Sequence, residues 1–282
     1  MTRRSAAASG RSAFAAVAAL LFASAACAGP TVTVFAASGA TPAAITATRD
    51  AFRAAVGGGS VAGANGDFGG VRREINWDGV PDARADPNLL PGDFFNVASP
   101  RGVEFSTPGT GFLVSANAGF SIPTLFGFSN DFQAFSAQRL FTAVASNTID
   151  VLFFEPGTNN AATTSAFALV FVDVEVAGST TLAFYDSTNS LIFTGDAPIG
   201  GNQGLSFLGA TVTGGAISRV RITSGLNTIL ANGTLGNSSD DVVVMDDFLY
   251  ATPTRAVPEP TSFALAMLGL GLAGLGFSRR KQ

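Results

Sequence analysis

The segment SAFALVFVDVEV, at residues 165–176, restricts the possible folds more than any other part of the chain. Residues 167–172 are all apolar. Because successive side chains of a strand point to opposite faces, a strand here would be apolar on both faces and would need a packing partner on each side. After Val172 the pattern alternates, with Asp173 and Glu175 on one side. We therefore expect the central strand of a layered structure, which continues toward solvent beyond Val172.

Other short runs of β-branched and aromatic residues lie between residues 71 and 250, separated by turn clusters such as EPGTNN, DSTNS and TGG. This succession of strands and turns is typical of all-β folds. Together with residues 167–172, which would be apolar on both faces of a strand, this succession predicts a mainly β protein, an antiparallel two-layer β-sandwich of jelly-roll-like form. The expected strands are VRREINW, VEFST, FLVSAN, TIDVLFF, SAFALVFVDVEV, TLAFYD, LIFTG, LSFLGA, ISRVRIT and DVVVMDDFLY.

One short N-terminal helix is expected before the strands, in the segment ATPAAITATRDAFRAAVGGG. Thr41 can cap its start, and the proline after it fits a first helical turn. Ile45, Phe52 and Val56 share one helical face, and Gly57 ends the helix. The body therefore combines one early helix with a β-sandwich.

The residue types that the chain lacks exclude several kinds of catalysis. It contains no histidine, one cysteine and one lysine, Lys281. Ser-His-Asp and Cys-His sites need an imidazole to carry the proton, and zinc, haem and iron–sulfur sites draw on cysteine and histidine. Carboxylate chemistry, supported by two tyrosines and the arginines, is what remains.

The first 28 residues have the parts of a secretory signal peptide. Arginines come first, residues 14–22 form a short apolar region, and Ala26 and Ala28 are the small residues of the cleavage site. The alternatives are a structural first helix and a lipoprotein signal that is cut before Cys27. Cleavage after Ala28 would leave a mature chain without cysteine, so export here implies no disulfide framework.

The C-terminus combines a proline-rich turn, a short apolar run and a basic end. A helix over residues 263–277 would span about 22 Å, against about 30 Å of bilayer hydrocarbon. A transmembrane helix at residues 262–278 can therefore cross only by thinning the bilayer or by snorkelling of its basic end. The residues concerned are Val257, Pro258, Glu259 and Pro260 before the run, and Arg279, Arg280 and Lys281 after it.

This three-part tail resembles the PEP-CTERM sorting signal of Gram-negative bacteria; the alternative is an ordinary tail anchor. The resemblance implies that an exosortase in the inner membrane cleaves the tail, and that the protein accompanies exopolysaccharide, as in a biofilm. It also implies transient insertion of the precursor in the inner membrane and a mature form at the cell surface or outside the cell. The body is similar to an uncharacterised group of β-rich proteins with this tag, through RREINWDGVPD, SFLG and DVVVMDDF, which implies shape and location only.

These features divide the chain into a signal peptide at 1–28, a β-sandwich ectodomain at 29–252 and a sorting segment at 253–282. Without both ends, ten arginines stand against 19 or 20 acidic residues, a net charge of about −9 to −10. Such a charge disfavours nucleic acid and anionic membrane surfaces as partners. It suits a surface or matrix protein, and it suits calcium binding.

Asp246 and Asp247 are neighbours in the last expected strand. Because adjacent strand residues face opposite sides, we expect that these two do not form an acid–base pair. One of them can point outward and join loop oxygens around a calcium ion, which prefers carboxylate and carbonyl ligands, with Asp173 as a partner. The alternative is a solvated strand edge or an ion pair with an arginine.

Trp77 is the single tryptophan, and Asp78, Asp82 and Asp86 crowd the loop after it. Because sugar sites often stack a ring on an aromatic side chain, Trp77 with Asp78 and Asp82 is the candidate ligand-binding set. The alternative places Trp77 in the core, since it alternates onto the same strand face as Ile75.

Asp173 and Glu175 have the same spacing in their strand as Arg219 and Arg221 in ISRVRIT. If the two strands are neighbours, cross-strand ion pairs form, each contributing about 0.2–1 kcal/mol. The functional alternative is a polar sugar-binding face. We expect the ion pairs.

The tail and the acidic sandwich together predict an exported, exosortase-sorted surface or matrix protein that associates with exopolysaccharide and is not an enzyme. The rival is a carboxylate-dependent glycoside hydrolase, which needs two carboxyl groups about 5–9.5 Å apart. Glu74, Glu104 and Glu155 are available, but nothing in the sequence brings two of them together. A purely structural or adhesive protein is the third interpretation. Calcium is the one cofactor under consideration.

Overall fold

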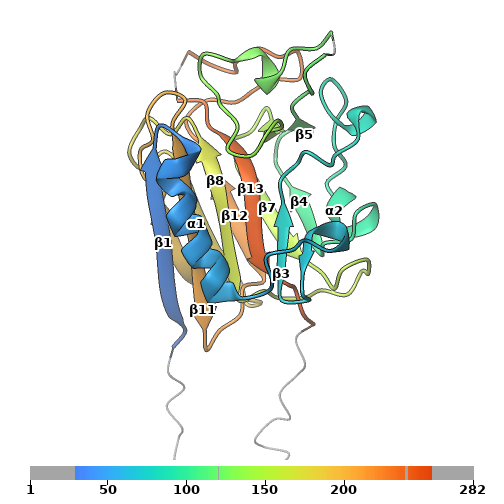
Figure 1. Ribbon diagram of the computed structural model, residues 1–282, viewed down its shortest axis with the longest axis vertical. Coiled ribbons are helices and arrows are strands. Elements are labelled where there is room, and N and C mark those ends of the chain that lie inside the picture. Colours follow the sequence, from blue (N-terminus) through green and yellow to red (C-terminus); the bar gives the residue numbers. More distant parts are fainter. Residues whose placement is uncertain (1–28, 120, 239–240, 256–282) are drawn as a thin grey trace, which may run out of the picture.

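The computed structural model describes residues 29–119, 121–238 and 241–255. Two antiparallel β-sheets lie face to face, and helix α1 crosses the outer face of the larger sheet (Figure 1). The predicted two-layer antiparallel sandwich with an early helix is confirmed. The predicted signal peptide, with Ala26 and Ala28, and the tail from Val257 to Lys281 lie outside the described residues.

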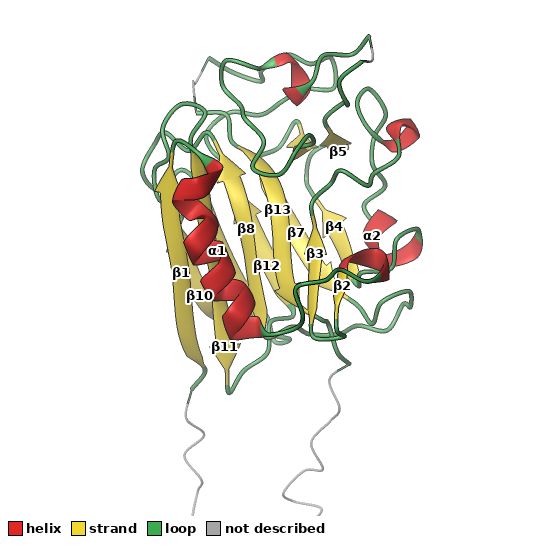
Figure 2. Ribbon diagram, viewed as in Figure 1, coloured by secondary structure: helices red, strands yellow, loops and turns green. Residues whose placement is uncertain are grey.

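Strands make up most of the ordered elements, with few helical turns between them (Figure 2). The helices are α1 (Pro42–Val56) and α2 (Phe94–Val97), and the 3₁₀ turns are η1 (Ala64–Gly66), η2 (Asp82–Arg84) and η3 (Leu125–Gly127). The strands are β1 (Thr31–Gly39), β2 (Asp67–Phe68), β3 (Arg72–Ile75), β4 (Val103–Ser106), β5 (Gly111–Val114), β6 (Phe141–Val144), β7 (Thr148–Phe153), β8 (Ala166–Val172), β9 (Thr181–Tyr185), β10 (Leu191–Asp196), β11 (Leu205–Thr213), β12 (Arg219–Thr223) and β13 (Val244–Ala251).

In the described residues the larger sheet has the strand order β1-β11-β8-β13-β3-β2, with β6 paired to β13 and β5 paired to β6. The smaller sheet has the order β10-β9-β12-β7-β4. From β7 onward the chain passes back and forth between the sheets. Strands β1, β2 and β6 are additions to those expected from the sequence.

Strand β8 is buried along its whole length and separates two apolar cores. Phe167 and Phe171 pack in the core between the sheets, whereas Val170 packs in the second core, which contains residues of α1. The doubly apolar run is therefore a central strand that is covered on both faces, as predicted. The strand ends at Val172, because Asp173 has a left-handed backbone with φ of 73°, so the predicted continuation through Glu175 is wrong.

Helix α1 occupies the segment predicted for it and lies against β1 and β11. Phe52 is fully buried and meets Phe35 of β1 and Phe207 of β11 edge-on, with ring centroids 5.5 and 5.9 Å apart. Gly57 follows the helix with φ of 91°, a conformation that favours glycine. Thr41 precedes it in an extended conformation, but its side chain makes no capping hydrogen bond.

Candidate functional site

A polar cavity of about 520 Å³ lies between the second half of α1, the loop that contains η1, and strands β3 and β13. Three arginines line it: Arg49 and Arg53 from α1, one helical turn apart, and Arg101 from the segment before β4. Glu74 of β3 and Asp247 of β13 supply the acids. Ligand sites combine a concave shape with a few directed polar groups, so this cavity is the candidate site.

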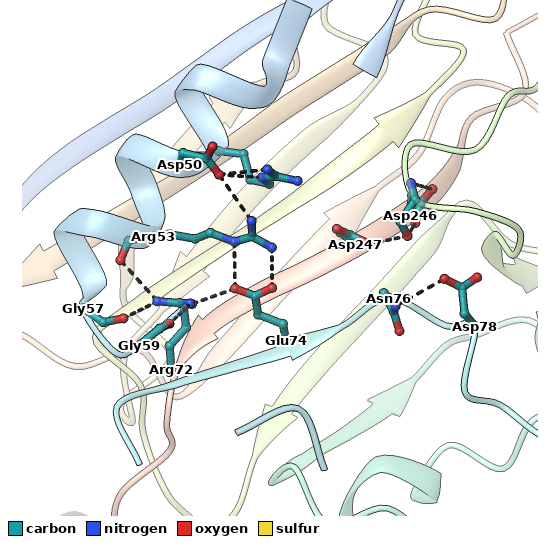
Figure 3. Close-up of polar contacts among 12 residues, drawn as sticks. Asp50, Arg53, Gly57, Gly59, Arg72, Glu74, Asn76, Asp78, Asp246 and Asp247 are labelled. Atoms are coloured by element: carbon teal, nitrogen blue, oxygen red, sulfur yellow. Dashed lines mark hydrogen bonds and ion pairs between the residues drawn. The ribbon is translucent and has the colours of Figure 1, made fainter. Parts of the chain in front are cut away.

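Glu74 joins helix α1 to strand β3 through two guanidinium groups (Figure 3). Arg53 donates to both of its carboxylate oxygens, at 2.9 and 2.6 Å, and the Nε of Arg72 donates at 2.7 Å. Arg72 also donates to the carbonyl oxygens of Gly57 and Gly59, which closes the C-terminal end of the helix. Glu74 thus accepts three guanidinium hydrogen bonds, which tie it to the end of α1 and to its own strand.

Asp246 and Asp247 lie at a β-bulge, where the pairing of β13 with β8 shifts between Met245 and Phe248. Both carboxyl groups reach one hydroxyl group: Ser136 Oγ lies 3.2 Å from Asp246 Oδ1 and 2.8 Å from Asp247 Oδ1. The prediction that these neighbours face opposite sides is therefore wrong, because a bulge breaks the two-residue alternation.

Both of these carboxyl groups are buried, and burial raises the pKa of each. The charge of Asp247 raises the pKa of Asp246 further. The backbone N–H groups of Phe135 and Ser136 act against that rise, since they donate to Asp246 Oδ2 at 2.6 and 3.2 Å. The pair holds a proton over a wider pH range than an exposed aspartate, and a protonated carboxyl group donates hydrogen bonds as well as accepting them.

Arg101 differs from the other arginines of the cavity because no acid of the described chain forms an ion pair with it. Its guanidinium lies over the Phe95 ring, 4.8 Å from the centroid, and its Nε is buried without a hydrogen-bond partner. Burial lowers the pKa of Arg101, and the nearby charge of Arg73 acts in the same direction while Tyr250 opposes it. A partly desolvated cation without a counter-charge is energetically unfavourable.

Trp77 lies in the core between the sheets, with 1% of its surface exposed. Its ring stacks on Phe141 at 4.0 Å and meets Phe248 edge-on at 5.1 Å, and its indole N–H donates to the carbonyl oxygen of Asp246 at 3.0 Å. The core interpretation of Trp77 is confirmed. The ligand-binding interpretation is wrong, because no face of the ring is left for a sugar.

Asp78 and Asp82 connect their loop to the segment before β6 through hydrogen bonds and an ion pair. Asp78 Oδ1 accepts the backbone N–H groups of Gln138 and Arg139, at 2.5 and 3.1 Å. Asp82 forms an ion pair with Arg139, whose side chain is 1% exposed. Asp82 and Asp86 line a separate hollow of about 310 Å³, apart from the cavity beside α1, so the three predicted ligand-binding residues do not share one site.

The three predicted calcium ligands do not converge either. Asp246 and Asp247 surround the Ser136 hydroxyl group, whereas Asp173 accepts the backbone N–H of Gln203 at 2.9 Å beyond the end of β8. Across residues 29–119, 121–238 and 241–255, no three His, Cys, Asp or Glu side chains are placed to hold a metal ion. The joint site of Asp246, Asp247 and Asp173 is therefore a wrong prediction.

Arg219 and Arg221 pair with Asp150 rather than with Asp173 or Glu175. Arg219 reaches Asp150 Oδ1 at 2.9 Å, and Arg221 contacts both carboxylate oxygens at 2.8 and 2.7 Å. The predicted ion pairs are wrong because β12 lies in the smaller sheet, beside β7, while β8 belongs to the larger sheet.

Sequence reasoning missed most of the cavity. Arg53 and Glu74 are 21 residues apart, and Ser136 and Asp247 are 111 residues apart. No local motif connects such residues, and only the sheet order brings them together. Asp247 and Glu74 were considered, but for roles that did not involve each other.

Comparison with known proteins bears on the tail rather than on the body. No curated protein matches the chain. Among solved structures, the GH26-CBM35 β-(1,4)-mannanase of Podospora anserina is similar at 13% identity, with a TM-score of 0.26, over 57% of this chain and 29% of the mannanase. A likeness of this size supports no conclusion about the body. None of the described helices is long and apolar enough to span a bilayer.

The tail has a clear counterpart. Residues 256–281 match the PEP-CTERM protein-sorting motif, and they contain the Pro-Glu-Pro sequence, the apolar run and the basic end noted in the sequence. The motif implies export, a membrane-anchored precursor and processing by an exosortase. The chain thus carries the PEP-CTERM protein-sorting motif of exported proteins that an exosortase processes.

Proposed function

We propose that this protein is an exported, non-catalytic β-sandwich protein that associates with exopolysaccharide after exosortase processing. The sorting motif at residues 256–281 is the observation that carries the proposal, because its resemblance implies proteins that accompany exopolysaccharide outside the inner membrane. The cavity beside α1 supports it. Sugar hydroxyl groups need directed donors and acceptors, and the arginine, asparagine and carboxyl groups of this cavity supply both.

The hydrogen bonds of Glu74 favour binding over hydrolysis. A catalytic base or nucleophile needs a free carboxylate oxygen directed at the substrate. Glu74 instead accepts from Arg53 on both oxygens and from Arg72 on one. These hydrogen bonds occupy both oxygens and hold Glu74 against the helix, which suits a positioning role better than attack on a glycosidic bond.

A glycoside hydrolase is the second candidate, and one observation favours it. Asp247, whose pKa burial raises, lines the same cavity as the arginine-bound carboxylate Glu74. Two carboxyl groups in unlike environments are the arrangement that glycosidases use for their acid and their base.

One experiment separates the candidates. The full-length chain, purified in mild detergent, is incubated with exopolysaccharide from its own host, and both co-sedimentation and new reducing ends are measured. We expect the protein to sediment with the polymer without new reducing ends; heat-unfolded protein is the control for trapping. New reducing ends that Asp247→Asn abolishes would replace our proposal with the hydrolase. Absence of both signals would contradict it and leave a structural or adhesive protein.

A further inference from the structure

We propose that the cavity beside α1 binds an acidic sugar unit, a hexuronate, whose carboxylate pairs with Arg101. This inference rests on the proposed function and names the class of polymer that the site selects. It depends on the charge, burial and surroundings of one arginine, and on the size and lining of the cavity that it faces.

The charge of Arg101 is uncompensated within the described chain, unlike that of its neighbours. Arg49 has Asp50 at 2.9 Å, and Arg53 has Glu74 at 2.6 Å. Arg101 has an aromatic ring beneath it and no acid. A carboxylate from a ligand would supply the missing partner, and it would gain a charge-assisted bond in a partly desolvated place, where such bonds are strong.

The local backbone holds the Arg101 guanidinium in place. The loop at Gly66 passes so close that a Cβ there would lie 2.9 Å from Arg101 Nε and 2.2 Å from the carbonyl oxygen of Glu74. The Phe95 ring supports the guanidinium from another side, with its centroid 4.8 Å away. A guanidinium that is fixed before binding loses little freedom on binding, and its planar fork matches a carboxylate.

The rest of the cavity suits a sugar ring rather than a bare anion. A volume of about 520 Å³ lies in the range of small-molecule sites, roughly 300–1,000 Å³. The other polar walls are short groups that can bond to hydroxyls: Asn65, Asn76, Ser136 and the protonatable Asp247. Although the body as a whole is acidic, three arginines line the cavity against two acids, Glu74 and Asp247, so the local charge does not repel an anionic sugar unit strongly.

Thermal unfolding of the full-length protein in detergent tests the proposal with three probes at equal ionic strength: sodium glucuronate, glucose and sodium sulfate. Because a ligand that binds only the folded state raises Tm with its concentration, we expect glucuronate to raise Tm more than glucose or sulfate. Arg101→Gln should weaken glucuronate binding about tenfold or more, from the loss of a charged hydrogen bond. Arg84→Gln is the matched control, because Arg84 is exposed and is not a lining residue of the cavity.

Each possible result of this experiment either supports or overturns the hexuronate proposal. Equal responses to glucuronate and glucose would overturn the proposal, and so would a response to sulfate as large as that to glucuronate, which would indicate a simple anion site. If Arg101→Gln fails to fold, the three probes on the wild type still decide, and Arg101→Lys, which keeps the charge, should keep the preference for glucuronate over glucose. If the protein still sediments with the exopolysaccharide but glucuronate does not raise its Tm, this inference is refuted while the proposed function stands.

Discussion

At the scale of single residues, Glu74 links the two arginines that connect helix α1 with strand β3. It is 11% exposed and accepts from Arg53, at the C-terminal end of α1, and from Arg72 in its own strand. Arg72 is buried, with 3% of its side chain exposed. One carboxylate therefore pairs with two arginines and fixes the helix that forms one wall of the cavity.

Glu74→Gln should lower the free energy of unfolding by about 3 kcal/mol, because removing one partner of a buried ion pair leaves the other charge uncompensated. Urea denaturation with an unchanged m-value measures the effect. The matched control is Asp50→Asn: the Asp50 side chain is 52% exposed, so its loss should cost less than about 1 kcal/mol. Equal small losses in both variants would mean that the Glu74 cluster does not hold the helix.

Asp173 makes the stability of the protein depend on pH. Burial raises its pKa from 3.8 to about 7; the N–H of Gln203 opposes the rise, and the charges of Glu175, Asp131 and Asp241 add to it. Because the folded state binds this proton more tightly than the unfolded state does, the contribution to stability is full below pH 3.8 and is lost as the pH rises through about 7.

The isosteric change Asp173→Asn removes that titration and keeps an oxygen for the N–H of Gln203. The Tm of the variant, relative to wild type, should therefore increase between pH 4 and pH 8. Thermal scans at constant ionic strength across this range provide the measurement, with Asp93→Asn, at an exposed position, as the control. Parallel Tm curves for Asp173→Asn and wild type would show that Asp173 does not titrate in this interval.

The residues of the cavity show where sequence reasoning stops. The local alternation placed Trp77 in the core correctly, although β3 ends at Ile75 and Trp77 has φ of 64°. The convergence of Asp246 and Asp247 could not be predicted, since it depends on a bulge in the pairing of β13 with β8. The lack of an acidic partner for Arg101 can be recognised only from the three-dimensional positions of the acids around it.

At the scale of elements, strand pairing leaves some positions no room for a side chain. Gly209 of β11 lies opposite Ala168 of β8, and a Cβ on Gly209 would come within 2.1 Å of the Ala168 Cβ. We expect Gly209→Ala to destabilise the protein by about 1–3 kcal/mol through forced backbone shifts. Gly79→Ala is the control, because nothing lies within 4 Å of a Cβ there. Similar unfolding midpoints in urea for both variants would contradict this account.

The elements that were predicted correctly carry strong local signals. Strand β8 has an unbroken apolar run, and α1 has an apolar face, a proline in its first turn and a glycine after its end. Strand β1 was missed because it directly follows the segment expected to be a signal peptide and continues into Ala-Ala-Ser-Gly, although its first five residues, TVTVF, favour a strand. In the structure β11 pairs with it along its full length and α1 covers it, and both of these interactions are long-range.

At the scale of the whole molecule, strand directions determine where the two terminal segments leave the sandwich. The pairs β1–β11, β11–β8 and β8–β13 are all antiparallel. Strand β1 therefore begins at the end of the larger sheet where β13 finishes (Figure 1). The chain before Thr31 and the chain after Ala251 meet the folded body at one end.

The tail itself carries the last prediction. If the sorting motif at residues 256–281 is an exosortase substrate, the sequence Pro258-Glu259-Pro260 is the part that we expect the enzyme to recognise, because prolines disfavour helix and leave a segment accessible. Deleting these three residues should leave the precursor uncut and retained in the membrane fraction, whereas wild type should give a shorter protein released from that fraction. Intact-mass spectrometry of both fractions measures this, with Arg255→Ala, just before the motif, as the control that should be processed normally. A deletion variant with the same shortened C-terminus as wild type would show that the protein reaches its destination by a route that does not use this motif.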